Sequence, residues 1–328
     1  VQIGTLEDWA KISASRSSLA VKTDGTLWSC GSDAYGKLGV DTVNVHMSSP
    51  VQIGSLTDWS KPYVTATTAF AIKTDGTLWG WGYNGKGNLG DNTTVKKSSP
   101  IQIGSANTWV SMMTNGSSES SGGIMASGKL YTWGKNTHGA LAQGDVINRS
   151  VPTQVGSLTD WASLSLTSAV GGAVKTDGTL WVWGNENVGI LGLGDTSIDY
   201  SSPVQVGSLT DWATISFGGN HAVAVKTDST LWTWGFNNDG QLGDNTTVRM
   251  SSPVQVGGLT TWSKAECFAN STLARKTDGT LWSWGNNGTG RLGLGHELNV
   301  SSPTQIGTET HWSSNFNAGL YVPMAITS

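Results

Sequence analysis

The amino-acid sequence predicts an all-β protein, a seven-bladed β-propeller, and three observations lead to this prediction. The 328 residues include 44 glycines and 17 tryptophans, and only 13% of them are charged. The phrase SLTDW, or a variant of it, recurs at intervals of 50 to 52 residues, with its tryptophan at positions 9, 59, 109, 161, 212, 262 and 312. Each interval contains several short apolar runs separated by Gly and Pro. A repeat of this length with about four strands is typical of a propeller blade.

Two further phrases recur in a constant order between these tryptophans. The phrase GTLWxWG contributes the other ten tryptophans, and a phrase of the type SSPVQIG follows it six times. Two positions of the GTLWxWG phrase depart from tryptophan, Cys30 and Tyr131. Because all 17 tryptophans fall in repeated positions, we expect them to build a repeated core rather than a single ligand site.

Each repeat predicts four strands in order. The first strand is of the type W-x-K-I-S, and the last contains P-V-Q-I-G. Between them, LAVKTDGTLWSWG gives two strands joined by Asp-Gly, as at Asp24, Asp177 and Asp278, which favours a type I′ hairpin turn. Asp228-Ser229 lacks the glycine, so this turn is expected to be strained or of another type. No segment shows an amphipathic helical period over three turns.

The repeats predict a single domain over residues 1–328 with an incomplete last blade. Six full blades are expected at about 9–54, 59–104, 109–156, 161–207, 212–257 and 262–307. The tail, 311–328, supplies HWSSNF and VPMAITS, and the head, 1–4, supplies VQIG, which together would form a seventh blade without its GTLWSWG strand. A six-bladed ring is the alternative. The chain starts at Val1, so we expect a processed, truncated or excised product, whose missing strand upstream sequence or another chain could supply.

These phrases resemble the regulator-of-chromosome-condensation (RCC1) repeat family. The resemblance rests on DGTLWSWG, a short glycine-bearing loop and LG, as in residues 76–90, followed by SSPVQIG and W-x-x-I. The wording KTDGTLW and SSPVQIGSLTDW is similar to the bacterial and bacteriophage branch of that family. The resemblance covers nearly the whole chain and implies a closed propeller, commonly of seven blades.

The sequence offers no catalytic constellation, and we expect neither an enzyme nor a cofactor. Its histidines, at 46, 138, 221, 296 and 311, lack metal-ligand spacing, and no nucleophile elbow or phosphate loop occurs. LGDNTT at Leu89 and Leu242 has too few ligands for a calcium loop, so no metal site is predicted. His221, in GGNHAVAV, is interpreted as a structural residue of the repeat. A net charge of −4 disfavours nucleic acid as a partner, and no apolar run is long enough for membrane insertion.

The loops between WG and LG differ in every repeat while the frame around them is constant. They read SDAYGK, YNGKGN, KNTHGA, NENVGI, FNNDGQ and NNGTGR, and equivalent positions should place them on one rim of the ring. Mixed aromatic and charged side chains on adaptable loops suit recognition. The predicted binding residues, expected to be exposed, are Tyr35, Tyr83, Lys135, His138, Glu186, Phe236, Asp239 and Arg291.

These observations favour a non-enzymatic recognition or structural module located on a virion or an extracellular or cell surface. Its resemblance to the bacterial and phage branch implies a bacteriophage virion protein (a capsid decoration or a tail or fibre component) or a bacterial surface adhesin. The expected partners are a protein, a cell-surface glycan or other virion proteins. The alternative is a secreted protein inhibitor of an enzyme that uses Tyr35, Tyr83 and Phe236. Nucleotide exchange on a small GTPase is disfavoured, because the basic tail and inserted wedge of the eukaryotic exchange factor do not occur here.

Overall fold

The computed structural model describes residues 8–113, 119–318 and 323–327, and within them the chain forms six four-stranded antiparallel sheets and one two-stranded sheet. The first three sheets contain β1 (Trp9–Ala14), β2 (Ser17–Lys22), β3 (Leu27–Gly31) and β4 (Met47–Gln52); β5 (Trp59–Val64), β6 (Thr68–Lys73), β7 (Leu78–Gly82) and β8 (Lys97–Gln102); and β9 (Trp109–Met113), β10 (Ser120–Met125), β11 (Leu130–Gly134) and β12 (Arg149–Gln154). The next three contain β13 (Trp161–Leu166), β14 (Val170–Lys175), β15 (Leu180–Gly184) and β16 (Tyr200–Gln205); β17 (Trp212–Phe217), β18 (His221–Lys226), β19 (Leu231–Gly235) and β20 (Met250–Gln255); and β21 (Trp262–Phe268), β22 (Ser271–Lys276), β23 (Leu281–Gly285) and β24 (Val300–Gln305). The last sheet pairs β25 (Trp312–Ala318) with β26 (Pro323–Thr327).

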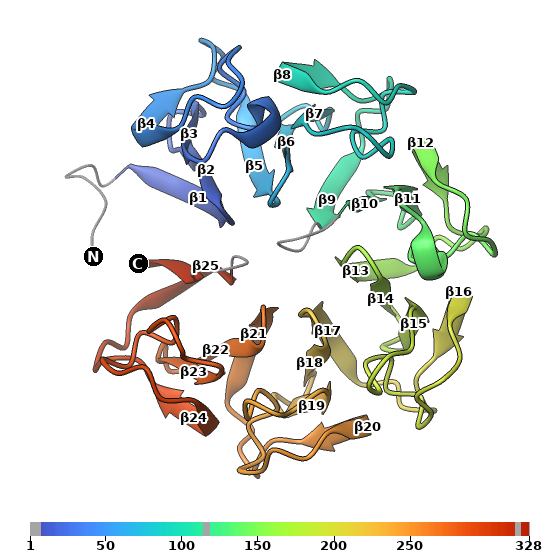
Figure 1. Ribbon diagram of the computed structural model, residues 1–328, viewed down its shortest axis with the longest axis vertical. Coiled ribbons are helices and arrows are strands. Elements are labelled where there is room, and N and C mark those ends of the chain that lie inside the picture. Colours follow the sequence, from blue (N-terminus) through green and yellow to red (C-terminus); the bar gives the residue numbers. More distant parts are fainter. Residues whose placement is uncertain (1–7, 114–118, 319–322, 328) are drawn as a thin grey trace.

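The sheets follow one another around a ring, which confirms the predicted propeller (Figure 1). The first strand of each sheet lies nearest the centre, and the fourth lies outside. The sheet of β25 and β26 lies between the sixth blade and the first, where β25 contacts both β1 and β21. The two tail strands therefore occupy a seventh position in the ring, next to six full blades. The predicted strand at Val1–Gly4 lies outside the described residues.

Hydrogen bonds within the DGTLW phrase explain its repetition. The Asp24 carboxylate accepts hydrogen bonds from the Thr26 amide at 2.9 Å and the Thr26 hydroxyl at 2.7 Å. The Thr26 hydroxyl in turn accepts the indole N–H of Trp28 at 2.8 Å. This local chain of bonds orients the first indole of each LWxW phrase as soon as the hairpin closes.

The hairpin turn itself differs from the type I′ prediction. Of Asp24 and Gly25, only the glycine has a positive φ, of 80°, whereas a type I′ turn needs two such residues. The Gly25 amide donates to the Lys22 carbonyl at 3.0 Å, and the Lys22 amide donates to the Thr26 carbonyl at 3.0 Å. This is a three-residue loop that ends in a left-handed residue. The aspartate keeps a negative φ because its side chain binds the threonine that follows the turn.

Replacing Ser229 by glycine is expected to stabilise the protein by about 1 kcal/mol, because a left-handed backbone costs a residue with a Cβ about 1–2 kcal/mol. Ser229 occupies the glycine position of the fifth turn with a φ of 64° and keeps the same hydrogen bond to Lys226, so the turn is strained rather than of another type. Chemical denaturation would measure the change. The reciprocal variant, Gly178→Ser, should lose stability, since a Cβ there would collide with the Thr210 carbonyl oxygen. No gain for Ser229→Gly would contradict the assigned strain.

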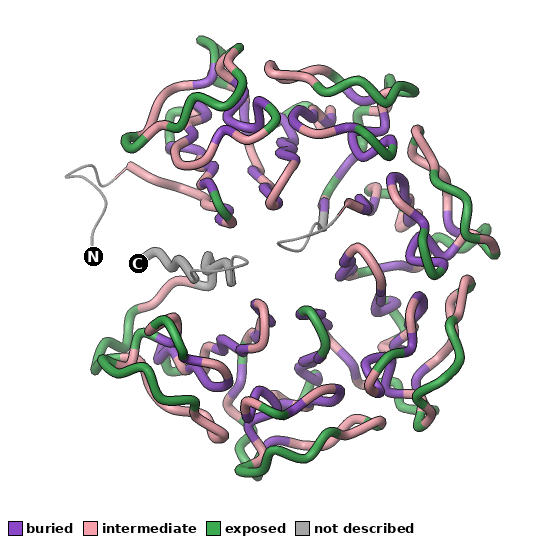
Figure 2. Tube along the Cα trace, viewed as in Figure 1, coloured by how far each residue is buried: buried purple, intermediate pink, exposed green. Residues whose placement is uncertain are grey.

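The second indole of each LWxW phrase joins one blade to the preceding one. Figure 2 shows that buried positions gather on the inner strands of the blades and exposed positions on the outer loops. The side chains of Trp81, Trp133, Trp183, Trp234 and Trp284 are fully buried, and each donates its indole N–H to a carbonyl oxygen of the previous blade at 2.7–3.0 Å. The accepting residues are Lys37, Asn88, Ala140, Ile190 and Gln241. In the first blade Cys30 takes this position. The first blade contacts β25 and β26. A thiol has no indole N–H, so Cys30 cannot form the hydrogen bond that joins each of the other five blades to the preceding one.

The lysine of the KTDG phrase lies between two indoles. In five repeats its ammonium group is 3.6–5.2 Å from the ring centroids of both tryptophans, in cation–π geometry. Four of these lysines also pair with the aspartate of TDW, or of EDW in the first repeat, at 3.1–3.6 Å. In the third repeat both charges are replaced together, by Met125 and Thr108. The charged residues of these phrases therefore have a structural role.

Candidate recognition surface

Antiparallel strand order brings the variable loops to one end of the blades. The loops between third and fourth strands, which we call the loop face, span residues 32–46, 83–96, 135–148, 185–199, 236–249 and 286–299. They lie beside the loops that join first and second strands: the Lys37 ammonium, for example, donates to the Ala66 carbonyl of the next blade at 2.9 Å. Burial lowers the pKa of Lys37 to about 8. The hairpin turns at the DG phrases lie at the opposite end of the blades.

The inner part of each loop is held by one buried polar residue. Its side-chain oxygen accepts the amide of the leucine five residues later at 2.8–3.0 Å in all six blades. The six residues are Asp33, Asn84, Asn136, Glu186, Asn237 and Asn287. They are at most 4% exposed. Glu186 belongs to this set, so its predicted exposure is wrong: the WG–LG pattern gives no sign of which loop residue points inward.

Four of the other predicted binding residues, Tyr35, Tyr83, His138 and Asp239, contact a neighbouring blade, and the predicted residues do not form one patch. The rings of Tyr35 and Tyr83 lie 5.0 Å apart, and Tyr35 is 43% exposed. Exposed His138 contacts Asp199 of the next blade at 2.9 Å through Nδ1. Two further residues make polar contacts within their own blades: Lys135 pairs with Glu119 at 2.8 Å in the third blade, and the Arg291 guanidinium donates to Thr289 at 3.3 Å in the sixth.

Asp239 and Phe236 occupy the fifth blade. The Asp239 carboxylate accepts hydrogen bonds from Asn299 at 2.9 Å and Asn270 at 3.2 Å, both in the sixth blade. Phe236 is half-buried. Figure 1 places this blade across the ring from the blades of Tyr35 and Tyr83, so the three predicted aromatic residues do not form one contiguous surface.

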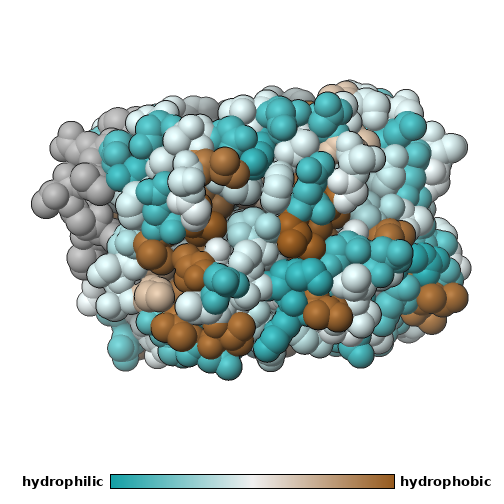
Figure 3. Space-filling model, turned by 90° about the horizontal axis from the view of Figure 1, so that it is seen from above, coloured by the Kyte–Doolittle hydropathy of each residue, from teal (hydrophilic) through white to brown (hydrophobic). Residues whose placement is uncertain are grey.

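Sequence reasoning missed a ring of exposed aliphatic residues on the loop face. Each lies two residues before a fourth strand, once in every four-stranded blade, and is 47–74% exposed. We call this set the aliphatic ring: Val45, Val95, Ile147, Ile198, Val248 and Leu298. The sequence does contain a signal for this ring: the position two residues before each fourth strand is Val, Ile or Leu in all six repeats, whereas most neighbouring loop positions are polar and variable. Seen from the side, the molecule carries separate apolar patches among polar residues (Figure 3).

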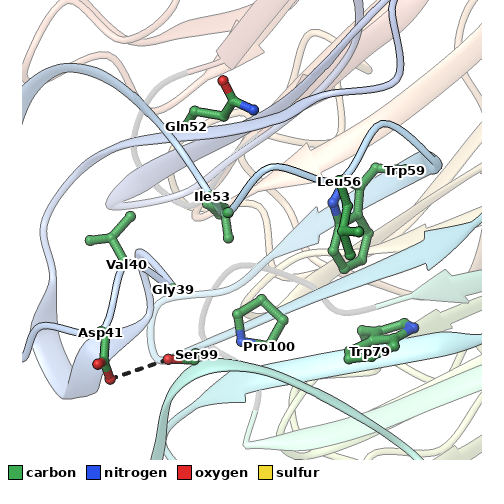
Figure 4. A pocket seen from close by; sticks show the side chains of 11 residues that line it. Gly39, Val40, Asp41, Gln52, Ile53, Leu56, Trp59, Trp79, Ser99 and Pro100 are labelled. Carbon is green, nitrogen blue, oxygen red and sulfur yellow. Dashed lines mark hydrogen bonds between the residues drawn. The ribbon is translucent and has the colours of Figure 1, made fainter.

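A hollow of about 430 Å³ opens between the first two blades (Figure 4). Its apolar lining comes from Val40, Ile53, Leu56, Trp59, Trp79 and Pro100. Its one carboxylate, Asp41, accepts a hydrogen bond from Ser99 at 3.2 Å. This lining suits an apolar side chain and provides no acid–base pair for catalysis.

His221 lies inside the ring rather than at its surface. Its side chain is fully buried, and Nε2 lies 3.1 Å from the Thr272 hydroxyl of the next blade. Burial lowers the pKa of this imidazole to about 3. The residue is therefore neutral and joins two blades, in agreement with its interpretation as structural.

Two general features of the described residues bear on function. Over residues 8–113, 119–318 and 323–327, no three His, Cys, Asp or Glu side chains are grouped so that they could hold a metal ion. Within the same described part of the chain, no helix has the length and apolar character that crossing a membrane requires.

Known proteins resemble this chain in sequence and in fold. A family model described as the regulator of chromosome condensation (RCC1) repeat matches residues 75–119, 127–172, 177–225, 228–275 and 278–319, more than half of the chain. The ultraviolet-B receptor UVR8 of Arabidopsis thaliana is 29% identical over 70% of this chain and 53% of its own length. The secretion-regulating guanine nucleotide exchange factor of Mus musculus is 28% identical over 68% of this chain and 54% of its own. The chain thus spans about half the length of these relatives.

Solved structures agree on the fold. Human WBSCR16 superimposes with a TM-score of 0.88 at 16% identity, over 100% of this chain and 89% of that chain. Prp20p from Saccharomyces cerevisiae superimposes with a TM-score of 0.81 at 17% identity, over 97% and 82% of the two chains. With six four-stranded blades in a ring and matching repeats over most of its length, the chain belongs to the RCC1 repeat family of β-propellers.

Proposed function

We propose that this protein is a non-enzymatic recognition module whose loop face binds a protein partner. The aliphatic ring is the observation that carries the proposal. An exposed position has no folding reason to be apolar, yet it is Val, Ile or Leu in all six full blades. Exposed apolar groups that recur around one face are typical of interaction sites. Several weak contacts on one rigid body also add up to strong binding.

The loops that carry the ring are held in place before any partner binds. The six buried residues from Asp33 to Asn287 each hold a loop through the leucine amide, and His138–Asp199 and Asp239–Asn299 link loops of adjacent blades. A pre-ordered surface loses little conformational entropy on association. The chemistry of the ring favours a protein partner over a glycan, because aliphatic side chains offer a sugar no hydrogen bonds.

The narrower proposal places the protein in the bacterial and bacteriophage branch of its family, on a virion or a bacterial surface. Support comes from the KTDGTLW and SSPVQIGSLTDW wording and from the low charge of the chain. The partner would then be another virion protein or a surface protein. Electron microscopy of the native source with labelled antibody should find the protein on particles at a constant copy number; a free monomer would contradict a virion role.

The contact between Tyr35 and Tyr83 favours one second candidate, an inhibitor of an enzyme. Two adjacent aromatic rings could enter a cleft, although Phe236 lies across the ring from them. The test is whether the protein retains a single enzyme with nanomolar affinity and whether the double variant Tyr35→Ala, Tyr83→Ala loses that binding. This result would favour an inhibitor over the proposal based on the aliphatic ring.

The triple variant Val95→Asp, Ile147→Asp and Val248→Asp is expected to lower partner retention at least tenfold, since each carboxylate disrupts one apolar contact. The measurement is the amount of partner protein that the immobilised chain retains from its native source, by quantitative mass spectrometry. The matched control, Leu158→Asp, Leu209→Asp and Leu259→Asp, changes exposed leucines of similar size at the opposite end of the blades and should retain the partner. Equal loss in both variants, or loss in neither, would contradict the assigned face.

A further inference from the structure

The fourth blade departs from its neighbours at the buried residue that holds each loop. In the third blade, the amide group of Asn136 donates to Asp145 twice, to its carbonyl oxygen at 2.9 Å and to Oδ1 at 3.0 Å. In the second and fifth blades, Asn84 and Asn237 donate to an aspartate Oδ1 seven residues later, at 2.8 and 3.2 Å. They also donate to the carbonyl oxygen of the threonine nine residues later, at 3.1 and 3.2 Å. In these blades the side-chain amide of the asparagine thus donates hydrogen bonds to a group of oxygen atoms in its own loop.

Glu186 stands at this position in the fourth blade and has no hydrogen to donate when ionised. Asp195 follows it by nine residues, as Asp145 follows Asn136. Glu186 Oε2 accepts the Leu191 amide at 2.8 Å, but Oε1 is buried without a hydrogen-bond partner. Asp195 Oδ1 is also buried without one. The two atoms that correspond to the donor and acceptor of the third blade are therefore both unpaired oxygens.

The positive charge that pairs with this aspartate in the third blade is also replaced. There Arg149, the first residue of β12, pairs with Asp145 at 2.6 Å. The first residue of β16 is Tyr200, whose hydroxyl donates to Asp195 Oδ2 at 3.1 Å. Compared with the third blade, the fourth blade therefore has a carboxylate (Glu186) in place of an amide and a tyrosine (Tyr200) in place of an arginine.

The remaining charged groups at this site do not restore the balance. The carboxylate of exposed Asp199 accepts the main-chain amide of Glu186 at 3.0 Å and contacts His138 at 2.9 Å, so the one imidazole nearby is already engaged. Burial, followed by the charges of Asp195 and Asp199, raises the pKa of Glu186 to about 7. Glu186 is buried and Asp195 is partly buried, and a buried carboxylate without a counter-charge is disfavoured in its ionised form.

We propose that Glu186 and Asp195 form a binding site for a hard divalent cation such as Ca²⁺, held by their unpaired oxygens and by main-chain oxygen atoms of the loop. Carboxylate and carbonyl oxygens together with water are the ligands that Ca²⁺ takes. The site has two carboxylates rather than three or more, so it would be an open site completed by water. Its cation takes the place of both the asparagine amide and the arginine of the third blade.

Calcium titration of the full chain, stripped with EDTA, tests the proposal. Isothermal calorimetry at pH 7.5 should show one Ca²⁺ per chain with a Kd of about 10⁻⁴–10⁻³ M, the range of extracellular calcium modules. Adding 10 mM CaCl₂ should raise the Tm by about 2 °C. Tb³⁺ luminescence gives an independent measurement of the same site.

Two variants remove the site by different routes, and one control leaves it intact. Glu186→Gln supplies an amide at the same length, and Tyr200→Arg supplies the base found in the third blade, so both should abolish saturable binding while circular dichroism stays unchanged. Asp145→Asn changes the corresponding acid of the third blade and should keep wild-type binding. Absence of saturable binding in the wild type, or wild-type affinity in Glu186→Gln, would overturn the proposal.

A proton shared between the carboxylates is the competing outcome, and stability against pH distinguishes it. Because the pKa of Glu186 is raised on folding, protonation would stabilise the protein below about pH 4.5, and this contribution would be lost as the pH rises through about 7. A fall in Tm over that window that Glu186→Gln removes, without any calcium binding, would overturn the cation site.

Discussion

Replacing Trp234 by alanine is expected to lower the free energy of unfolding by about 3–5 kcal/mol, the range for large aromatic residues in a core. The side chain is fully buried among residues of the fourth and fifth blades, including Leu191, Ile215 and Phe217. Its indole N–H donates to the Ile190 carbonyl at 2.7 Å across the blade boundary. The variant removes apolar contacts and leaves a buried carbonyl without its donor, so both losses weaken the same interface.

Trp234→Phe separates these two contributions. It keeps most of the ring volume and removes the N–H, so we expect a smaller loss of about 1–3 kcal/mol. Guanidinium denaturation followed by circular dichroism measures both variants without relying on tryptophan emission. A loss below 1 kcal/mol for Trp234→Ala would show that this indole is not a main contact between blades.

Acidification is expected to destabilise the protein through His221. The pKa of this buried imidazole is lowered to about 3, whereas in the unfolded chain it is near its ordinary value of 6.5. Below pH 6.5 the unfolded chain therefore binds a proton that the folded protein does not. Stability from this group is complete above pH 6.5 and falls by about 1.4 kcal/mol for each pH unit below it, or about 3 kcal/mol at pH 4.5.

The His221→Gln variant isolates this contribution from the carboxylates, which titrate in the same range. Glutamine stays neutral, so the variant should lose less stability than the wild type between pH 6.5 and 4.5, whatever its stability at pH 7.5. Urea denaturation at several pH values gives both slopes. Parallel slopes would mean that His221 is protonated in the folded state, contrary to its burial.

Local phrases predicted the strands and core well because their information is contained in each repeat. Asp24, Thr26 and Trp28 hydrogen-bond to one another within five residues, so the hairpin and the orientation of its indole follow from neighbouring side chains. The turn type was predicted wrongly for a related reason. The pair Asp-Gly occurs in both turn types, and the bond from Asp24 to Thr26 selects the longer one.

The recognition surface could be predicted only in part. The loops were located by their variation, but the exposure of Glu186 was predicted wrongly because inward and outward positions alternate irregularly in a loop without strand periodicity. The pairing of Tyr35 with Tyr83 and of His138 with Asp199 joins residues about 50–60 positions apart. No pattern within one repeat contains these contacts.

The amino-acid sequence alone determined that this protein is a ring of repeated antiparallel sheets with a tryptophan core, because spacing, turns and apolar alternation are local and occur six times over. Only the tertiary structure decided which repeated residues are buried and which face solvent. It brought the aliphatic ring together on one face, and it left one carboxylate oxygen of Glu186 and one of Asp195 buried without a hydrogen-bond partner. The physical reason is that burial depends on how a loop folds back on its own blade and packs against the neighbouring blade, which is distant in sequence and adjacent in space.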